Sequence, residues 1–210
     1  MTRAQRGRPV GASGEETRRR IVVATMRCVA TAGYARATIR EIARTANVTS
    51  ASLYNYFPNK SELMKAAVAA RTDIAVPRLR RAAARPGDAI TRLEAVLDES
   101  GRLMREYPDL AAFEWVIRAE NAIAVDATAP GGFQAFREII GGIVEDAFRE
   151  GGLAAGADRR GVAEAIYALI YGLTELAATL APADYHAALA SARQLVRGTL
   201  LAAASRHSPR

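Results

Sequence analysis

The sequence predicts an all-α protein with two parts, a short N-terminal helix-turn-helix head and a larger helical body. Three observations lead to this prediction. Apolar residues recur at helical spacing, no segment alternates like a strand, and the excess positive charge lies at one end. We expect a flexible basic arm over residues 1–14, the head over 15–60 and a regulatory and dimerisation body over 61–205. A helix over 60–76 is expected to connect them.

Composition restricts the classes of protein to which the chain could belong. Half of the 210 residues are hydrophobic, which indicates a folded protein. No apolar run approaches the roughly 18 residues of a membrane span, and no hydrophobic signal region is seen at the N-terminus. Cys28 is the only cysteine, so an internal disulfide is not possible. We therefore expect a cytoplasmic protein without a membrane partner.

Net charge is unevenly distributed along the chain. Residues 1–60 hold 11 basic and 3 acidic side chains, a net of +8, whereas residues 61–210 hold 18 basic and 19 acidic ones, a net of −1. Because phosphate contacts dominate nucleic-acid affinity, this segregation favours a polyanionic partner for the N-terminal end. The arm carries Arg3, Arg6 and Arg8, and it could order against DNA or serve as a solubilising tail.

A first helix is predicted over residues 15–32. Its apolar residues recur at helical spacing, and Gly33 supplies a stop. Cys28 lies on the apolar stripe, so we interpret it as a core residue and not as a redox sensor.

Residues 38–60 have the pattern of two short helices joined by a tight corner. Thr38 and Glu41 have the spacing of a capping box, which fixes a helix start through reciprocal side-chain-to-backbone hydrogen bonds. Asn47 suits the left-handed backbone of such a corner, and Thr49 can cap the second helix. The exposed side of that helix is small and polar, which suits insertion into a major groove. An ordinary helical hairpin has a similar pattern.

These motifs together resemble the TetR family of bacterial repressors. The resemblance extends over about residues 15–70 without a gap, and it is carried by Gly33-Tyr34, Thr38-Ile39-Arg40-Glu41-Ile42-Ala43, Val48-Thr49, Leu53-Tyr54-Asn55-Tyr56-Phe57 and Lys60-Ser61-Glu62-Leu63. It implies a homodimer that binds a palindromic operator and releases it when a small ligand enters the C-terminal domain.

The same resemblance implies which residues contact DNA. Thr38 and Lys60 would bind phosphate, and Arg40 would reach phosphate or a base edge. The second helix would contribute Thr49, Ser50, Ala51, Ser52, Tyr54, Asn55 and Tyr56. Because this helix has no arginine or lysine, we expect its specificity to depend on small side chains, thymine methyl groups, Arg40 and DNA shape.

Five further helices are predicted in the body. The helix that starts at Lys60 is expected to break or kink near Pro77, because proline removes a backbone donor. The segments that follow are expected at residues 89–106, 108 to about 124, 131 or 132 to 149, 159–180 and 183–205.

The last two helices are the candidates for a dimer interface. Leucine and other apolar residues recur there at alternating spacings of four and three, which is close to a heptad seam. The candidate interface residues are Ile166, Leu169, Leu173, Leu176, Leu189, Val196 and Leu200. The alternative is that these stripes only bury a core within one chain.

Aromatic and polar residues on the middle helices are candidates for a ligand cavity, although aromatic residues at helical spacing also build ordinary cores. They are Phe113, Trp115, Arg118, Asn121, Phe133, Phe136, Tyr167, Tyr171 and Glu175. Such a set suits a small, largely apolar effector, whose identity the sequence leaves open.

The sequence has no signature of a catalytic or metal site. A nucleophile motif, a phosphate loop and a His-based triad are all missing, and His186 and His207 belong to no spaced set of metal ligands. No catalytic residue, cofactor or metal is therefore assigned. We predict a ligand-responsive homodimeric repressor whose partners are double-stranded palindromic DNA, a second copy of itself and an effector. The alternatives are an activator or a ligand-independent regulator and, in another class, a helical enzyme or small-molecule carrier.

Overall fold

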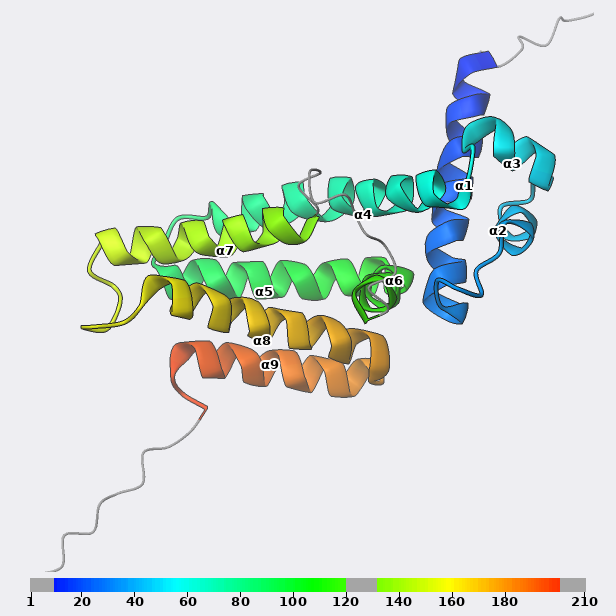
Figure 1. Cartoon of the computed structure of the whole chain (residues 1–210). Coiled ribbons are helices and arrows are strands. Elements are labelled where there is room, and N and C mark those ends of the chain that lie inside the picture. Colours follow the sequence, from blue (N-terminus) through cyan, green and yellow to red (C-terminus); the bar gives the residue numbers. More distant parts are fainter. Residues whose placement is uncertain (1–9, 120–131, 201–210) are drawn as a thin grey trace, which may run out of the picture.

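The computed structural model describes residues 10–119 and 132–200, and within these ranges every regular element is an α-helix (Figure 1). This confirms the all-α prediction for the described part of the chain. The helices are α1 (Val10–Ala32), α2 (Ile39–Thr45), α3 (Ser50–Tyr56), α4 (Lys60–Ala83), α5 (Ala89–Glu106), α6 (Pro108–Ala119), α7 (Gly132–Arg149), α8 (Arg159–Thr179) and α9 (Pro182–Arg197).

Side-chain caps fix the starts of five helices. At each one, an oxygen of the residue before the helix accepts a hydrogen bond from a backbone N–H three residues later. The capping residues are Thr38, Thr49, Asn59, Asp88 and Asp158. Only half of the predicted capping box forms at Thr38, because the Glu41 carboxylate pairs with Arg44 instead.

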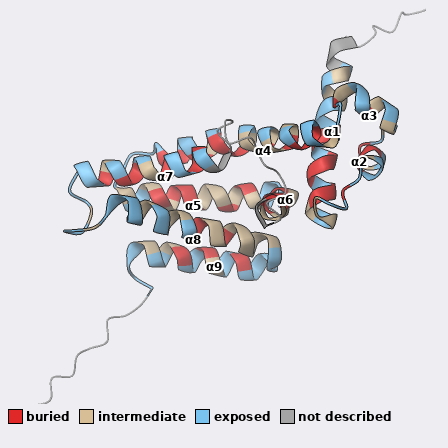
Figure 2. Ribbon diagram, viewed as in Figure 1, coloured by how far each residue is buried: buried red, intermediate tan, exposed pale blue. Residues whose placement is uncertain are grey.

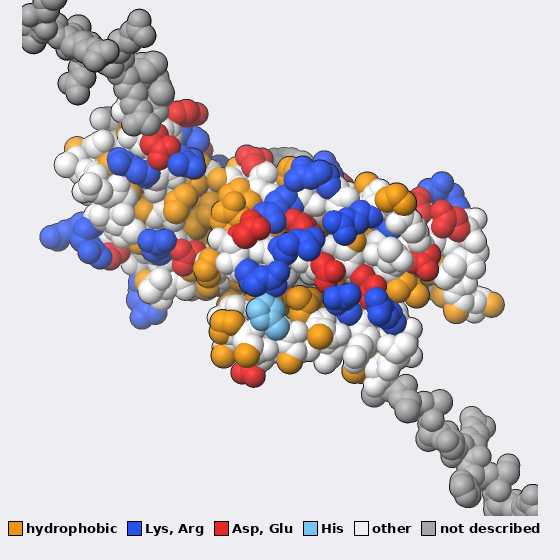
Figure 3. Space-filling model, turned by 180° about the vertical axis from the view of Figure 1, so that it is seen from behind, with side chains coloured by type: hydrophobic (Ala, Val, Ile, Leu, Met, Phe, Trp, Pro, Cys, Tyr) orange, Lys and Arg blue, Asp and Glu red, His pale blue; other side chains and the backbone are white. Residues whose placement is uncertain are grey.

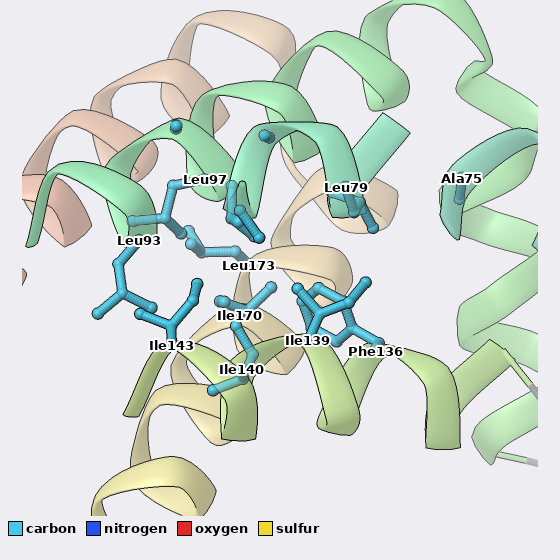
Figure 4. Packing of buried hydrophobic residues seen from close by; sticks show 14 of the residues in the cluster. Ala75, Leu79, Leu93, Leu97, Phe136, Ile139, Ile140, Ile143, Ile170 and Leu173 are labelled. Carbon is cyan, nitrogen blue, oxygen red and sulfur yellow. The ribbon is translucent and has the colours of Figure 1, made fainter. Parts of the chain in front are cut away.

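Two hydrophobic cores lie on either side of a junction. The head core is built from α1–α3 and the start of α4, and Leu110, Phe113 and Ile117 of α6 extend it towards the body. The body core is formed by α4, α5, α7, α8 and α9 (Figure 2). Its centre is a layer in which side chains of α5, α7 and α8 face one another (Figure 4), among them Leu93, Leu97, Ile139, Ile140, Ile143, Ile170 and Leu173.

Helix α4 belongs to both cores, and α6 of the head core also contacts the body. Leu63 and Ala67 of α4 lie in the head core, whereas Ala75 and Leu79 lie in the body core. Helix α6 packs on α1 of the head and on α8 of the body, and Figure 1 shows it end-on between the two parts. Helices α4 and α6 therefore connect the head to the body.

Three helix boundaries differ from the sequence prediction. Helix α4 continues through Pro77 to Ala83, because the residues after Pro77 are buried in the body core and this burial offsets the lost hydrogen bond. Helix α9 ends at Arg197 and not at 205, because Gly198 adopts a left-handed backbone with φ of 71° and closes it. Helix α1 starts at Val10, so residues 10–14 of the predicted arm are helical; residues 1–9 lie outside the described part.

Helix α8 is long and apolar enough, by length and composition only, to cross a membrane. Glu164 and Glu175 interrupt its apolar stretch, so α8 does not contain an uninterrupted apolar run of about 18 residues. In the structure α8 packs against α6, α7 and α9, and Ile170 and Leu173 are buried in the body core. It is therefore a body helix whose outer face remains exposed.

Candidate nucleic-acid interface and effector cavity

The corner between α2 and α3 has the geometry expected of a helix-turn-helix. Asn47 adopts a left-handed backbone with φ of 55°, and the Val48 N–H donates to the Ala43 carbonyl at 2.9 Å. Asparagine tolerates this conformation better than most residues. Ile42 on α2 and Leu53 on α3 are fully buried, which fixes the angle between the two helices.

The outer face of α3 is uncharged and accessible. Ala51, Tyr54 and Asn55 are exposed, and Tyr54 retains 51% of its accessible surface. Of the other predicted contacts, Thr38, Arg40 and Thr49 are exposed, whereas Ser50, Ser52 and Tyr56 are half-buried. Ala51, Tyr54 and Asn55 are therefore the α3 residues best placed to meet base edges.

An open groove runs between α2 and the start of α3. Arg40, Arg44 and Asn47 line it together with Thr49 and Ser50. This arrangement places two guanidinium groups beside a recognition helix that has no basic residue of its own. Arg44 was not predicted, although it lies four residues after Arg40 and therefore on the same face of α2.

Arg44 is paired within the head. Its hydrogen bond with Glu41 lowers the pKa of the Glu41 carboxyl and raises that of the Arg44 guanidinium. Both side chains are well exposed, so the pair is weak and a phosphate can compete for Arg44. Figure 3 shows basic side chains, with some acidic ones among them, on both the head and the body.

Lys60 is engaged inside the head. Its ammonium donates to the Tyr34 carbonyl and lies 4.2 Å from the centroid of the Tyr34 ring. The side chain thus ties the start of α4 to the segment that precedes α2. A phosphate contact from Lys60 remains a prediction, and it would require the ammonium to share or leave this site.

A cavity of about 50 Å³ lies inside the body. It is lined by side chains of six helices: Arg71, Ala75, Val76, Leu79, Ser100, Leu103, Met104, Leu110, Glu114, Phe136, Tyr167, Ile170, Tyr171, Leu173, Thr174, Tyr185 and Leu189. A water needs about 10–15 Å³ of such space, and a drug-sized ligand occupies roughly 300–1,000 Å³. The cavity in this conformation therefore has room for a few waters, and a larger ligand would have to widen it.

A buried ion pair borders this cavity. Arg71 of α4 donates to the carboxylate of Glu114 of α6, and the two residues are only 8% and 5% exposed. Neither was predicted. The burial of Arg71 is indicated by its position in the sequence. It lies four residues after Ala67 and four before Ala75, and so on the apolar stripe of α4.

Aromatic rings form one side of the cavity. The ring centroids of Phe136 and Tyr167 are 6.0 Å apart, and those of Tyr167 and Tyr171 are 6.3 Å apart. These three predicted residues line the cavity, and Trp115 lies behind Tyr171 with its ring centroid 6.3 Å away. The prediction was wrong for Phe113, which is buried in the head core, and Glu175 does not line the cavity either.

Two other pocket candidates, the Arg118 side chain and Asn121, lie outside the described residues, as does the Phe133 side chain. Among the residues that are described, no cluster of three or more His, Cys, Asp or Glu side chains could hold a metal ion.

Residues 21–67, which span the second half of α1 and the whole helix-turn-helix, match the family model described as bacterial regulatory proteins of the tetR family. The head of the chain is therefore similar to the corresponding region of TetR-family regulators. The HTH-type transcriptional repressor KstR of Mycolicibacterium smegmatis is 32% identical over 116 residues, which is 55% of this chain and 55% of the relative. The match thus spans about half the length of each protein.

Solved structures of TetR-type regulators share the fold of the chain. A TetR transcriptional regulator from Chloroflexus aurantiacus superposes with a TM-score of 0.72 at 19% identity and covers 89% of this chain and 96% of its own. The transcriptional regulator FadR from Bacillus subtilis, solved in complex with stearoyl-CoA, has a TM-score of 0.70 at 18% identity, covering 86% and 98%. These likenesses show that the chain shares the fold of these regulators.

The structure limits which of the predicted interface residues can face a second copy of the chain. Leu173 and Leu189 are buried in the chain's own core, so their assignment to a dimer interface was wrong. Ile166, Leu169, Leu176 and Val196 are half-buried against the same core, and Leu200 is exposed beyond the end of α9. The heptad-like spacing indicates that these residues are buried. It does not show whether a helix of the same chain or of a second copy covers them.

The exposed residues of α8 and α9 include several small ones, namely Gly161, Ala165 and Ala168 on α8 and Ala187 and Ala190 on α9. The apolar Leu195 and the polar Glu164, His186, Ser191 and Gln194 are exposed as well. Small side chains allow the backbones of two helices to approach closely, so this outer face of α8 and α9 is suited to helix packing.

Proposed function

We propose that the chain is a transcriptional repressor that binds a palindromic operator as a homodimer and releases it when a small effector enters the body. The observation that supports this most directly is the connection between its two sites. The head that carries the exposed α3 face is attached to the body by α4 and α6, and both helices line the cavity.

In the proposed DNA complex, α3 enters the major groove. Ala51, Tyr54 and Asn55 would meet base edges and the adjoining backbone, while Arg40 and Arg44 supply the positive charge for phosphate contacts. The identity of the relative KstR as a transcriptional repressor supports this direction of regulation.

The homodimer would form through the outer face of α8 and α9. One seven-residue recognition helix offers few base contacts, whereas two heads related by a two-fold axis read two half-sites of a palindrome. Packing α8 and α9 of two copies together gives a four-helix interface. Burial of this face would also cover the exposed apolar surface of α8, as expected for a protein that stays in the cytoplasm.

Effector control would follow from thermodynamic linkage. The cavity is too small for an effector in this conformation, so binding would widen it and displace α4 or α6. If the displaced form spaces the two heads wrongly, the effector lowers operator affinity, and DNA lowers effector affinity by the same factor. The stearoyl-CoA in the Bacillus subtilis FadR structure supports an effector with a long apolar chain for a body of this shape.

A salt-dependent binding titration tests the proposal. Fluorescence anisotropy with labelled DNA from upstream of the gene should show binding that weakens steeply as salt rises, because each neutralised phosphate adds about 0.9 to the slope. The control is a scrambled duplex of the same length and composition, which should bind more weakly. Equal affinity for the two duplexes at every salt concentration would contradict a sequence-specific operator.

A further inference from the structure

We propose that the DNA interface of the head extends beyond the helix-turn-helix onto the exposed face of α1, where a groove lined by arginines takes the phosphate backbone that adjoins each half-site. This inference rests on the proposed operator binding and adds a second contact surface to it.

Helix α1 holds much of the positive charge of the N-terminal end. Four of the 11 basic residues among residues 1–60 lie on it, namely Arg18, Arg19, Arg20 and Arg27. The Arg18 guanidinium lies over the ring of Phe57, 5.0 Å from its centroid. The other three arginines line a separate groove, so the helix-turn-helix alone does not account for the positive charge of the head.

This groove lies between α1 and the corner that joins α2 to α3. Arg19, Arg20, Val23 and Arg27 line it on α1, and Asn47 lines it at the corner. Its lining, as far as the structure describes it, has no acidic side chain. Val23, in the middle, retains 50% of its accessible surface, so no described segment covers this face. The groove is therefore open to a partner with negative charge.

The periodicity of α1 places these residues on the outside of the head. Ile21 and Cys28 are buried in the head core. Arg20, Val23 and Arg27 are exposed, and their spacings of three and four residues place them in one stripe along another side of the helix. From Arg20 to Arg27 the helix rises about 10 Å, which corresponds to about three base-pair steps along the DNA axis.

The groove on α1 is continuous with the groove beside the recognition helix. Asn47 lines both of them, with Arg40 and Arg44 on the α3 side and Arg20 on the α1 side. A phosphate backbone that passes Arg44 can therefore continue around the corner to Arg20. An acidic segment of another protein would also suit the charge of the α1 groove. DNA is favoured because the groove opens directly onto the proposed operator-binding face.

Two of the three arginines have carboxylate partners, and both pairs are exposed. Arg19 lies 3.1 Å from Glu16, and Arg27 lies 3.0 Å from Asp109. Exposed ion pairs contribute little to stability, so a phosphate can compete for either guanidinium. Arg20 is the residue to replace, because its removal leaves both of these pairs intact.

The salt dependence of DNA binding by the full-length protein tests the proposal. Arg20→Ala should weaken binding to the upstream duplex and reduce the salt slope by about 1, because one phosphate contact is lost. The ratio of wild-type to variant affinity should fall about threefold as salt rises from about 50 to about 200 mM. The scrambled duplex should lose affinity by the same factor, because phosphate contacts carry no sequence information.

Two further variants serve as controls. Arg20→Lys keeps the positive charge and should keep the salt slope. Arg81→Ala removes an equal charge from the exposed far end of α4 and should change neither the affinity nor the slope. Circular dichroism checks that each variant is folded, which is expected because Arg20 is exposed and alanine favours helices.

Neutral phosphate analogues locate the contact on the DNA. A methylphosphonate at one position of the duplex removes a single backbone charge. At one or more positions the substitution should weaken binding of the wild type but not of Arg20→Ala, whereas positions that α3 contacts should affect both proteins alike. An unchanged salt slope in Arg20→Ala, or the same sensitive positions in both proteins, would overturn the inference and leave the groove to another anion, such as an acidic protein segment.

The wild type separates this inference from the proposed function. If it prefers the upstream duplex to the scrambled one and Arg20→Ala binds equally well, only the contact by α1 is wrong. If the wild type binds neither duplex at low salt, the proposed operator binding and the inference fail together.

Discussion

Arg27 of α1 and Asp109 of α6 form an ion pair with 3.0 Å between Arg27 Nε and Asp109 Oδ2. The pair joins the first helix of the head to the start of a helix that lines the body cavity. Both side chains are largely exposed, so the pair adds little to the free energy of unfolding, less than about 1 kcal/mol. Its position nevertheless places it directly between the two proposed sites.

The variant Asp109→Ala should therefore weaken the coupling between the head and the body more than it lowers the free energy of unfolding. We expect DNA binding to change Trp115 fluorescence in the wild type, because α6 moves with α1, and to change it less in the variant. The matched control is Glu145→Ala, which removes an equally exposed pair with Arg159 away from the junction. A loss of signal in both variants, or in neither, would show that the Arg27–Asp109 pair has no special role.

Arg40 should supply affinity for all DNA sequences alike. The variant Arg40→Ala removes a guanidinium from the groove beside α3, so we expect weaker binding to every duplex and a salt slope reduced by about 1. Arg81→Ala, on the exposed far end of α4, is the control and should leave both quantities unchanged. A change in the preferred sequence without a change in salt slope would instead assign Arg40 to base readout.

Gly101 permits the close packing of α5 on α9. A Cβ atom at this position would lie 2.6 Å from Cδ2 of Leu189, which is itself buried and has little room to move. Gly101→Ala should therefore lower the free energy of unfolding by about 1–3 kcal/mol.

The control for this prediction is Gly141→Ala on α7, where a Cβ atom meets nothing within 4 Å. Helix propensity alone should raise stability there, by up to about 1 kcal/mol. Urea unfolding measures both variants. Equal effects of the two substitutions would mean that the α5–α9 contact is looser than described.

The outer face of α8 can be tested with a single charge. Ala168→Arg places a long cation in the middle of the small-residue face, so the proposed dimer should dissociate and the molar mass measured by light scattering should halve. Ala155→Arg, in the exposed loop before α8, is the control and should remain dimeric. A wild-type protein that is monomeric at micromolar concentration would remove the dimer from the proposal altogether.

The head could be predicted from the sequence because its determinants are local. Thr38 and Thr49 cap helices that begin one residue later, and Asn47 takes the left-handed backbone that the corner needs. Each of these interactions joins residues within a few positions of one another, so their spacing alone reveals them.

The interior of the body could not be predicted in the same way. Leu173 has the spacing of an interface residue, but α5 and α7 of the same chain cover it. Arg71 lies on the apolar stripe of α4, which indicates burial, but its partner Glu114 is 43 residues away and spacing within one helix does not identify it. Periodicity shows which face of a helix is buried, whereas the identity of the covering helix depends on tertiary packing.

Selection of DNA from a random library by the full-length protein tests the central claim, that the head reads a palindrome as one half of a dimer. The account predicts enrichment of a sequence with two inverted half-sites, and loss of that enrichment when Tyr54 and Asn55 on the exposed face of α3 are both replaced by alanine. Recovery of no enriched sequence at low salt, or of a single half-site bound by one protomer, would contradict it.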